Sequence, residues 1–185
     1  TLACVNRLDN TVSLIRRPEN DVYATLETGE GPASIASLSD GRFAVANTFS
    51  DTVTLVDPKG EGSAQTLNNV PAVPTVVAAS LDYLAVAGRA APILALFSSS
   101  DFSKAPALLP LEDIPVSIAA LPENRFAVAT KSALFLVNAA GEKVIGRKSI
   151  AVRDLAADGP SLYVLADHAL LHLDAALEEV ETIAL

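Results

Sequence analysis

The segment Phe43-Ala-Val-Ala-Asn-Thr-Phe-Ser-Asp-Thr-Val-Thr-Leu-Val-Asp57 holds two apolar runs on either side of a short polar turn. Each run is four to five residues long and rich in Ala, Val and Leu. Short apolar runs bounded by polar turn residues are typical of buried strands. The segment therefore predicts two neighbouring antiparallel strands.

The same pair of runs recurs along the whole chain. The first runs of the five pairs begin 41, 41, 42 and 36 residues apart, and the second runs begin 41, 40, 41 and 36 residues apart. Two markers that keep one period indicate a repeat architecture. The first runs are residues 2–6, 43–47, 84–88, 126–130 and 162–166, and the second runs begin at Thr11, Thr52, Pro92, Ala133 and Ala169.

Each unit holds two further strands. Residues 34–38 precede the turn Ser39-Asp-Gly-Arg42, in which glycine supplies the positive φ of a tight hairpin turn. Residues 22–28 form another run before Pro32. Four antiparallel strands in about 40 residues are typical of a β-propeller blade.

The sequence therefore predicts an all-β protein: a β-propeller of about five four-stranded blades, with 19 strands visible, in one domain covering residues 1–185. The predicted units are residues 1–31, 32–72, 73–113, 114–150 and 151–185. Residues 169–185 also suit an amphipathic helix by propensity, but the repeat predicts strands there.

The repeat also predicts which residues surround the central channel. The innermost strands are expected at residues 34–38, 75–79, 116–120 and 151–155. Small and β-branched side chains of the following strands are expected to pack between blades. These are Ala44, Val45, Ala85, Val86, Ala127, Val128 and Val164.

The first two units resemble the YVTN-repeat family of propellers. Asn47-Thr-Phe-Ser-Asp-Thr-Val-Thr-Leu-Val-Asp57 and Val5-Asn-Arg-Leu-Asp-Asn-Thr-Val-Ser-Leu-Ile15 are similar to its central strand pair, and Gly29-Glu-Gly-Pro32 is similar to its blade junction. The later units have Gly88, Thr130 and Ala166 in place of the asparagine. The resemblance implies a lactonase-like or surface propeller with an extracytoplasmic location, in the periplasm or at the cell surface.

The first unit begins directly with its second strand, so the count of strands is one short of five full blades. Residues 2–6 are then expected to present an unpaired edge, and unpaired edges favour association. We expect this strand to be completed by omitted residues, a second copy or a partner chain. The chain is also consistent with part of a larger, seven-bladed ring.

Composition excludes several classes of protein. The net charge of -9 argues against a duplex nucleic acid partner, because such affinity comes largely from Lys and Arg on phosphates. The longest uncharged stretch, residues 62–81, contains polar residues and two prolines, so no transmembrane segment is predicted. Cys4 is the single cysteine, which excludes an intrachain disulfide.

Signatures of catalysis or metal binding are scarce. No nucleophile elbow, phosphate-binding loop or zinc-protease motif is present. His168 and His172 on one strand would stand roughly 13 Å apart, too far to share a metal. No catalytic residue, metal ligand or cofactor is assigned, and calcium is kept as an option because paired carboxylates suit it. The carboxylates are Asp57, Glu112, Asp113, Asp174, Glu178, Glu179 and Glu181.

Superposing the units brings basic residues to one mouth of the channel. Turns between the second and third strands lie on the same face as the connections between blades, and cations there would attract an anionic ligand or partner. The candidate ligand-binding residues are Arg7, Arg89, Lys131, His168 and, at the last blade junction, Arg153.

The function predicted from these features is a non-enzymatic scaffold that binds a protein, a peptide or another anionic ligand with loops on one face. The alternative is a lactonase-like or quinoprotein-like enzyme with a metal or cofactor at the channel. The missing convergence of histidines and carboxylates favours the scaffold.

Overall fold

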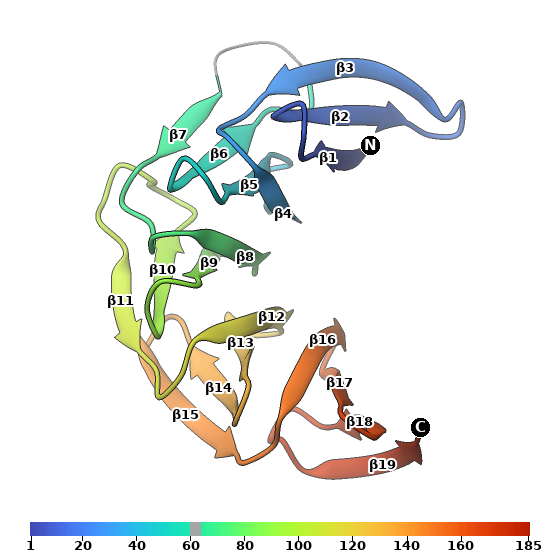
Figure 1. Ribbon diagram of the computed structural model, residues 1–185, viewed down its shortest axis with the longest axis vertical. Helices are drawn as coiled ribbons and strands as arrows, with labels where there is room; N and C mark the ends of the chain where they lie inside the picture. Colours follow the sequence, from blue (N-terminus) through green and yellow to red (C-terminus); the bar gives the residue numbers. More distant parts are fainter. Residues whose placement is uncertain (60–63) are drawn as a thin grey trace.

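The structure is a computed structural model that describes residues 1–59 and 64–185. Its described residues form only strands, turns and loops, organised as five antiparallel sheets. The sheets stand one after another in chain order along an arc, as blades around a common centre (Figure 1). The described residues thus fold as the predicted all-β propeller architecture.

The first two blades hold seven strands. Blade 1 holds β1 (Leu2–Asn6), β2 (Thr11–Arg16) and β3 (Asp21–Glu27). Blade 2 holds β4 (Pro32–Ser37), β5 (Phe43–Asn47), β6 (Thr52–Val56) and β7 (Gln65–Leu67). Within each blade, every strand pairs with its neighbours in sequence, as expected for an up-and-down sheet.

The other three blades have four strands each. Blade 3 holds β8 (Pro74–Ala79), β9 (Tyr83–Gly88), β10 (Ile93–Ser98) and β11 (Ala107–Pro110). Blade 4 holds β12 (Pro115–Leu121), β13 (Arg125–Thr130), β14 (Leu134–Asn138) and β15 (Lys143–Lys148). Blade 5 holds β16 (Val152–Asp158), β17 (Ser161–Ala166), β18 (Ala169–Leu173) and β19 (Glu179–Ala184).

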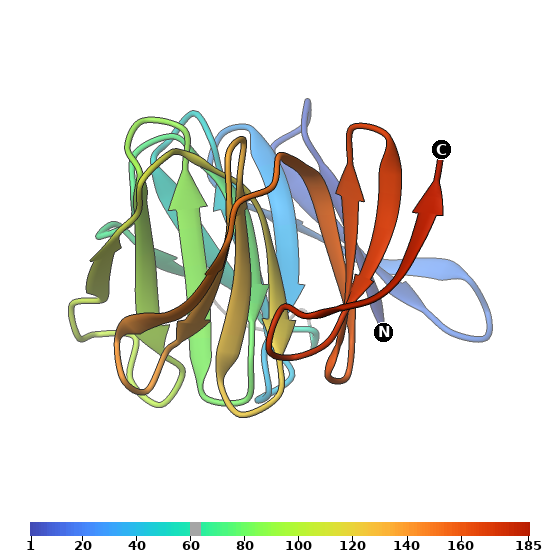
Figure 2. The ribbon, with the colours of Figure 1, turned by 90° about the horizontal axis from the view of Figure 1, so that it is seen from below.

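The first strand of blades 2 to 5 lies on the inner side of the arc, and the last strand lies on its outer rim (Figure 1). The predicted innermost strands are confirmed as β4, β8, β12 and β16, with starts that differ by one or two residues. The predicted strand at the C-terminus is also confirmed, because β18 and β19 occupy the segment that suited a helix. Figure 2 shows the blades edge-on, with turns on two opposite faces.

Alternation along each second strand decides how blades pack. Leu84 and Val86 point to blade 2, while Ala85 and Ala87 point to blade 4. The same division holds in blades 2 and 4, where alanines face the following blade and larger side chains face the preceding one. Small side chains let adjacent sheets approach closely, and the interlocking with larger ones excludes voids. The predicted packing positions are confirmed as buried.

Blade 5 breaks this rule on its far face. Tyr163 and Leu165 stand where blades 2 to 4 have alanine, and both are 37% exposed. Tyr163 stacks on His172 of the neighbouring strand, with ring centroids 5.0 Å apart. The repeat alone predicts that His172 lies buried between two blades. In the structure His172 lies with Tyr163 on the face of blade 5 that is turned away from blade 4.

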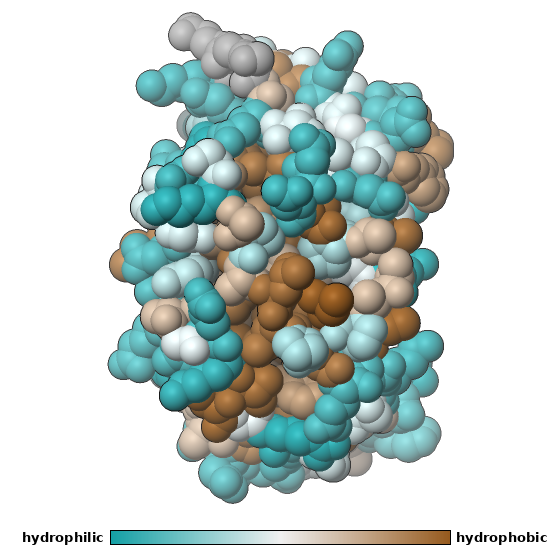
Figure 3. Space-filling view, turned by 90° about the vertical axis from the view of Figure 1, so that its left-hand side faces the viewer, coloured by the Kyte–Doolittle hydropathy of each residue, from teal (hydrophilic) through white to brown (hydrophobic). Residues whose placement is uncertain are grey.

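The outer rim carries apolar side chains among charged ones. Leu108 of β11 and Val144 and Ile145 of β15 are exposed there. Figure 3 views this side of the arc and shows hydrophobic side chains gathered near its centre with hydrophilic ones around them. Among the described residues, no helix is long and apolar enough to cross a membrane.

Candidate functional site

One face of the arc carries the turns between second and third strands together with the connections between blades. Backbone groups join the two sets: Gly31 N–H donates to the Asn10 side chain at 2.8 Å, and Val73 N–H donates to Asp51 at 2.7 Å. Arg89 N–H donates to the Val73 carbonyl at 3.0 Å. We call this face the mouth face. These bonds tie the turns of blades 1 to 3 to the connections between blades.

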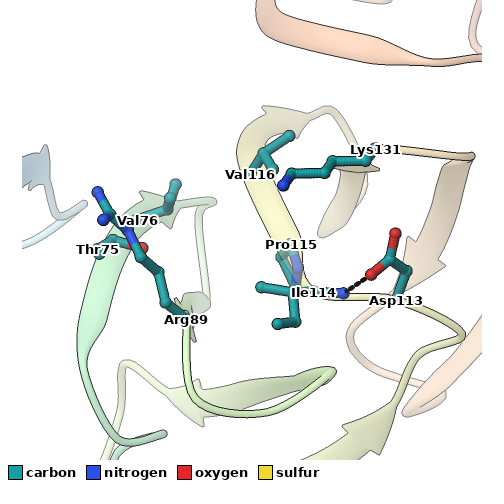
Figure 4. Close-up of a pocket in the computed structure, with 8 residues that line it drawn as sticks. All are labelled: Thr75, Val76, Arg89, Asp113, Ile114, Pro115, Val116 and Lys131. Atoms are coloured by element: carbon teal, nitrogen blue, oxygen red, sulfur yellow. Dashed lines mark hydrogen bonds between the residues drawn. The ribbon is translucent and has the colours of Figure 1, made fainter.

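Two of the predicted basic residues share one hollow in the mouth face. Arg89 follows β9 and Lys131 follows β13, so they come from equivalent turns of blades 3 and 4. The hollow has a volume of about 580 Å³, within the usual range for ligand pockets. Figure 4 shows both side chains reaching toward the start of an innermost strand, Arg89 beside Thr75 and Lys131 beside Val116.

The charge of this Arg89–Lys131 pocket is positive although the chain is acidic. Neither cation forms an ion pair within 4.0 Å with a carboxylate of the described residues. Asp113 also lines the pocket, but its carboxylate accepts the Ile114 N–H at 2.7 Å and faces the Ser132 hydroxyl at 3.5 Å. Apolar walls of Val76, Ile114, Pro115 and Val116 complete it. Such a pocket suits an anionic group attached to an apolar body.

Two more of the predicted residues lie in blade 5, outside the Arg89–Lys131 pocket. Arg153 is the second residue of β16 rather than part of the connection before it, and its guanidinium donates to Asp167 at 2.7 Å. His168 follows Asp167 in the turn between β17 and β18. Arg153 therefore already has a carboxylate partner within the chain, unlike Arg89 and Lys131.

The hydrogen bond from Arg153 lowers the pKa of Asp167 below its ordinary value, and the charges of Arg153 and His168 add to this. A carboxyl whose pKa is lowered by folding stabilises the fold above its ordinary pKa, and this contribution is lost as the pH falls through the lowered value. We expect Arg153→Gln to return the pKa of Asp167 toward its ordinary value in a carbon-13 NMR titration. Arg16→Gln, at a remote ion pair with Asp21, is the control. An unchanged Asp167 pKa in Arg153→Gln would contradict this assignment.

Arg7 lies apart from the Arg89–Lys131 pocket, in blade 1. Its guanidinium sits over the ring of Phe49, 5.4 Å from the centroid, and the ring remains 68% exposed. A ring carbon of Phe49 also lies 2.5 Å from where a Cβ on Gly31 would stand, so a side chain there would displace the ring, and the φ of 66° at Gly31 also favours glycine. The mouth face thus carries an exposed aromatic ring of blade 2 beside Arg7 of blade 1, and a cationic pocket in blades 3 and 4.

The asparagines that carry the YVTN resemblance hold the sheet together. Asn47 is fully buried, and its amide donates to the hydroxyls of Thr52 at 3.0 Å and Thr54 at 2.8 Å. Asn6 makes the equivalent bonds to Thr11 at 2.9 Å and Ser13 at 2.8 Å. These side chains link the second and third strands of a blade and do not line the Arg89–Lys131 pocket.

Three of the carboxylates considered for calcium, Asp57, Glu112 and Asp174, have partners nearby in the chain or on the next blade. Glu112 forms a bidentate pair with Arg147, and Asp174 accepts the N–H groups of Ala176 and Glu178. Asp57 accepts the Lys59 N–H at 2.8 Å. Within residues 1–59 and 64–185, no group of three or more histidine, cysteine, aspartate or glutamate side chains is placed to hold a metal ion.

Sequence reasoning found the two cations of the pocket but missed its other polar groups. Thr75 is in β8 and Asp113 is in the connection before β12, and neither residue type recurs at the equivalent positions of the other blades. Phe49 was also missed. A single aromatic residue in a turn has no distinguishing sequence pattern, and its contact with Arg7 of blade 1 depends on the fold.

Comparison with known proteins supports the fold. No protein-family model matches the chain, and no curated protein matches it by sequence. Solved structures do match: hydrazine synthase of Kuenenia stuttgartiensis has a TM-score of 0.71 at 18% identity, covering 83% of this chain and 49% of that one. Apo AztD from Citrobacter koseri has a TM-score of 0.67 at 14% identity, covering 100% and 59%.

A third similar structure is the dihydro-heme d1 dehydrogenase NirN in complex with DHE, with a TM-score of 0.76 at 14% identity, covering 99% of this chain and 44% of that one. These structures are β-propeller proteins, and together with the five blades they identify the fold of this chain as a β-propeller. The chain spans about half the length of the chains it matches.

Proposed function

We propose that this propeller is a non-enzymatic binding scaffold whose mouth face holds an anionic group of a protein or peptide partner. The observation that carries the proposal is the Arg89–Lys131 pocket, where two cations without a described carboxylate partner flank an apolar hollow. A cation pair in a concave site focuses the field and favours a negatively charged group. A fold that hosts many functions does not itself decide between them, so the proposal rests on this site.

The expected contact is a carboxylate on Arg89 and Lys131, with apolar parts of the partner against Ile114 and Val116. Arginine binds carboxylates through paired N–H donors, and lysine adds a point charge. The resemblance of the first two units to YVTN repeats supports placing the protein in this group of surface propellers, with an extracytoplasmic location. Completion of blade 1 by an added strand is a separate part of the proposal.

The pocket is tested with a short glutamate-rich peptide as the probe. We expect its addition to shift the amide NMR signals of Thr75, Arg89 and Lys131. The double variant Arg89→Gln/Lys131→Gln should weaken binding about tenfold or more, because two charge-assisted contacts are lost. Binding should also weaken with added salt, because the contact is exposed and ionic.

The matched control is Arg16→Gln/Lys143→Gln, which removes the same two charges at sites outside the pocket lining. A lysine-rich peptide of equal length should give no shift in the pocket. Equal weakening by both double variants would show that net charge rather than the pocket governs the binding, and would overturn the proposal.

A further inference from the structure

The cation pair of the Arg89–Lys131 pocket belongs to one junction between blades. The residue that follows the second strand is Arg89 in blade 3 and Lys131 in blade 4, and these blades are adjacent. In blade 2 the equivalent residue is Thr48, which is buried and donates its hydroxyl hydrogen bond to the Pro74 carbonyl at 3.0 Å. In blade 5 it is Asp167, which carries the opposite charge. Within the described chain, two such cations therefore meet only where blades 3 and 4 adjoin.

The innermost strands present irregular backbone to this pocket. The pairing of β8 with β9 skips Thr75, and the pairing of β12 with β13 skips Val116. A residue skipped in this way is left unpaired in the ladder of backbone hydrogen bonds. Both residues line the pocket, so their backbone groups can bond to a ligand there. The same shift occurs in β4 and β16, so the side chains around it decide what each junction binds.

The charges of the pocket favour a ligand with a single negative charge. Arg89 and Lys131 supply two positive charges and Asp113 one negative charge, which leaves one positive charge in excess. One Asp113 oxygen accepts the Ile114 N–H at 2.7 Å. The other lies 3.5 Å from the Ser132 hydroxyl, which is longer than an ordinary O–H···O hydrogen bond. This second oxygen can accept an N–H from a ligand, and it would repel a second carboxylate.

Apolar walls lie directly beside the two cations. Figure 4 shows Arg89 on the side of β8, near Val76, and Lys131 on the side of β12, near Val116. Ile114 also lines the pocket and is 37% exposed. At the end of a polypeptide, the carboxylate and the last side chain leave the same Cα. One terminal residue can therefore meet the cations and the walls together, whereas the carboxylate of a glutamate is carried on methylene groups without an apolar branch.

We propose that the Arg89–Lys131 pocket binds the C-terminal residue of a partner polypeptide, and that this residue has an aliphatic side chain. Its carboxylate contacts Arg89 and Lys131, as expected for capture of a chain end by charge-assisted hydrogen bonds. Its side chain packs on Ile114 and Val116, and its amide N–H donates to the second oxygen of Asp113. The proposal rests on the binding-scaffold function and deepens it, because it identifies the anionic group as a chain end.

Charge also favours a chain end over a free amino acid. An acylated C-terminal residue carries one negative charge, which complements the one positive charge that the pocket has in excess. A free amino acid carries an ammonium group as well and has no net charge. We therefore expect acetyl-leucine to bind more tightly than leucine, although both offer the same carboxylate and the same side chain.

The main test compares two peptides that differ only at the C-terminus. Both are acetylated, consist of glycine and serine and end in valine and leucine, but one has a free carboxylate and the other a carboxamide. We expect the free acid to bind at least ~10-fold more tightly, because the carboxamide loses the charge-assisted contacts with Arg89 and Lys131. Isothermal titration calorimetry measures the affinities, and shifts in the amide NMR signals of Thr75 and Lys131 locate the site.

A second comparison tests the aliphatic contact. Glycine in place of the last leucine of the free-acid peptide should weaken binding roughly fivefold or more, because the apolar contact with Ile114 and Val116 is lost. Ile114→Ser should remove most of this preference for leucine and keep the preference for the free carboxylate. Leu108→Ser is the matched control, at an exposed leucine of β11 outside the pocket lining, and should leave both preferences unchanged.

Equal affinities of the free acid and the carboxamide would overturn the proposal. If a glutamate-rich peptide with an amidated C-terminus still binds through Arg89 and Lys131 in that case, the binding-scaffold function stands and only the chain end fails. Leucine that binds as tightly as acetyl-leucine would identify a free amino acid as the ligand and would also refute the proposal. Free-acid binding that survives Arg89→Gln/Lys131→Gln would contradict both proposals, because the pocket would not be the site.

Discussion

Phe126→Ala is expected to cost about 4 kcal/mol of the free energy of unfolding, because truncating a buried phenylalanine removes its apolar burial and leaves a cavity. Phe126 is fully buried at the interface of blades 3 and 4. It packs in one cluster with Ala85 and Ala87 of blade 3 and with Val128 and Phe135 of its own blade. The alanines cannot move into the space that the ring vacates, because they are fixed on β9.

Urea unfolding followed by far-ultraviolet circular dichroism measures this loss. Phe49→Ala is the matched control, because its ring is exposed on the mouth face, and it should cost less than about 1 kcal/mol. A loss of 4 kcal/mol is a large part of the ordinary stability of a domain, so Phe126→Leu serves as a second variant with an expected loss of roughly 1.5 kcal/mol or less. Equal losses for Phe126→Ala and Phe49→Ala would contradict the packing described for blades 3 and 4.

The blade interfaces could be predicted from the sequence because two periods coincide there. The repeat near 40 residues places equivalent strands in adjacent blades, and the two-residue alternation of a strand assigns each side chain to one blade face. The sequence therefore predicts Ala85 and Val86 at blade interfaces, and both are fully buried. Tyr163 follows the same register but is partly exposed, because no described blade covers its face of blade 5.

The candidate site was less predictable, because its geometry depends on contacts between turns. The repeat placed Arg89 and Lys131 at equivalent positions, and the structure brings them to one hollow. It also placed Arg153 with them, but the nearby Asp167 engages that guanidinium. Whether a cation is free or paired depends on side-chain positions across strands, and a periodic pattern carries no information about those distances.

Some glycines can be explained from the sequence pattern, and others only from the structure. Gly31 precedes Pro32 in a junction that resembles a known repeat, and its φ of 66° fits the turn expected there. Val73 occupies the matching position before Pro74 with a φ of 55°, which a β-branched residue rarely adopts. Gly88 stands where Asn6 and Asn47 stand in the first two blades, so the repeat marks it only as a departure. An isolated glycine in a strand often marks a close approach of another backbone.

Gly88→Ala is expected to destabilise the protein by about 3 kcal/mol or more, because overpacking against backbone cannot be relieved by a side-chain rotation. A Cβ at this buried position would stand 2.2 Å from the carbonyl oxygen of Ala72 and 2.9 Å from that of Val73. To make room, the connection between blades 2 and 3 must move. That movement also strains the bond from the Arg89 N–H to the Val73 carbonyl, so the base of the Arg89–Lys131 pocket shifts with it.

Urea unfolding of Gly88→Ala should therefore show a lower midpoint, and the acidic peptide should bind this variant more weakly than the parent even under conditions where both are folded. Gly141→Ala is the matched control, because the nearest atom to its added Cβ is 3.4 Å away in an exposed turn, and it should change stability by less than about 1 kcal/mol. If Gly88→Ala is as stable as Gly141→Ala, the connection has room to yield and the close approach of the two backbones is not what requires glycine there. If stability falls while acidic-peptide binding is unchanged, the pocket is held by its own turns, and the bond between Arg89 and Val73 is not needed to position it.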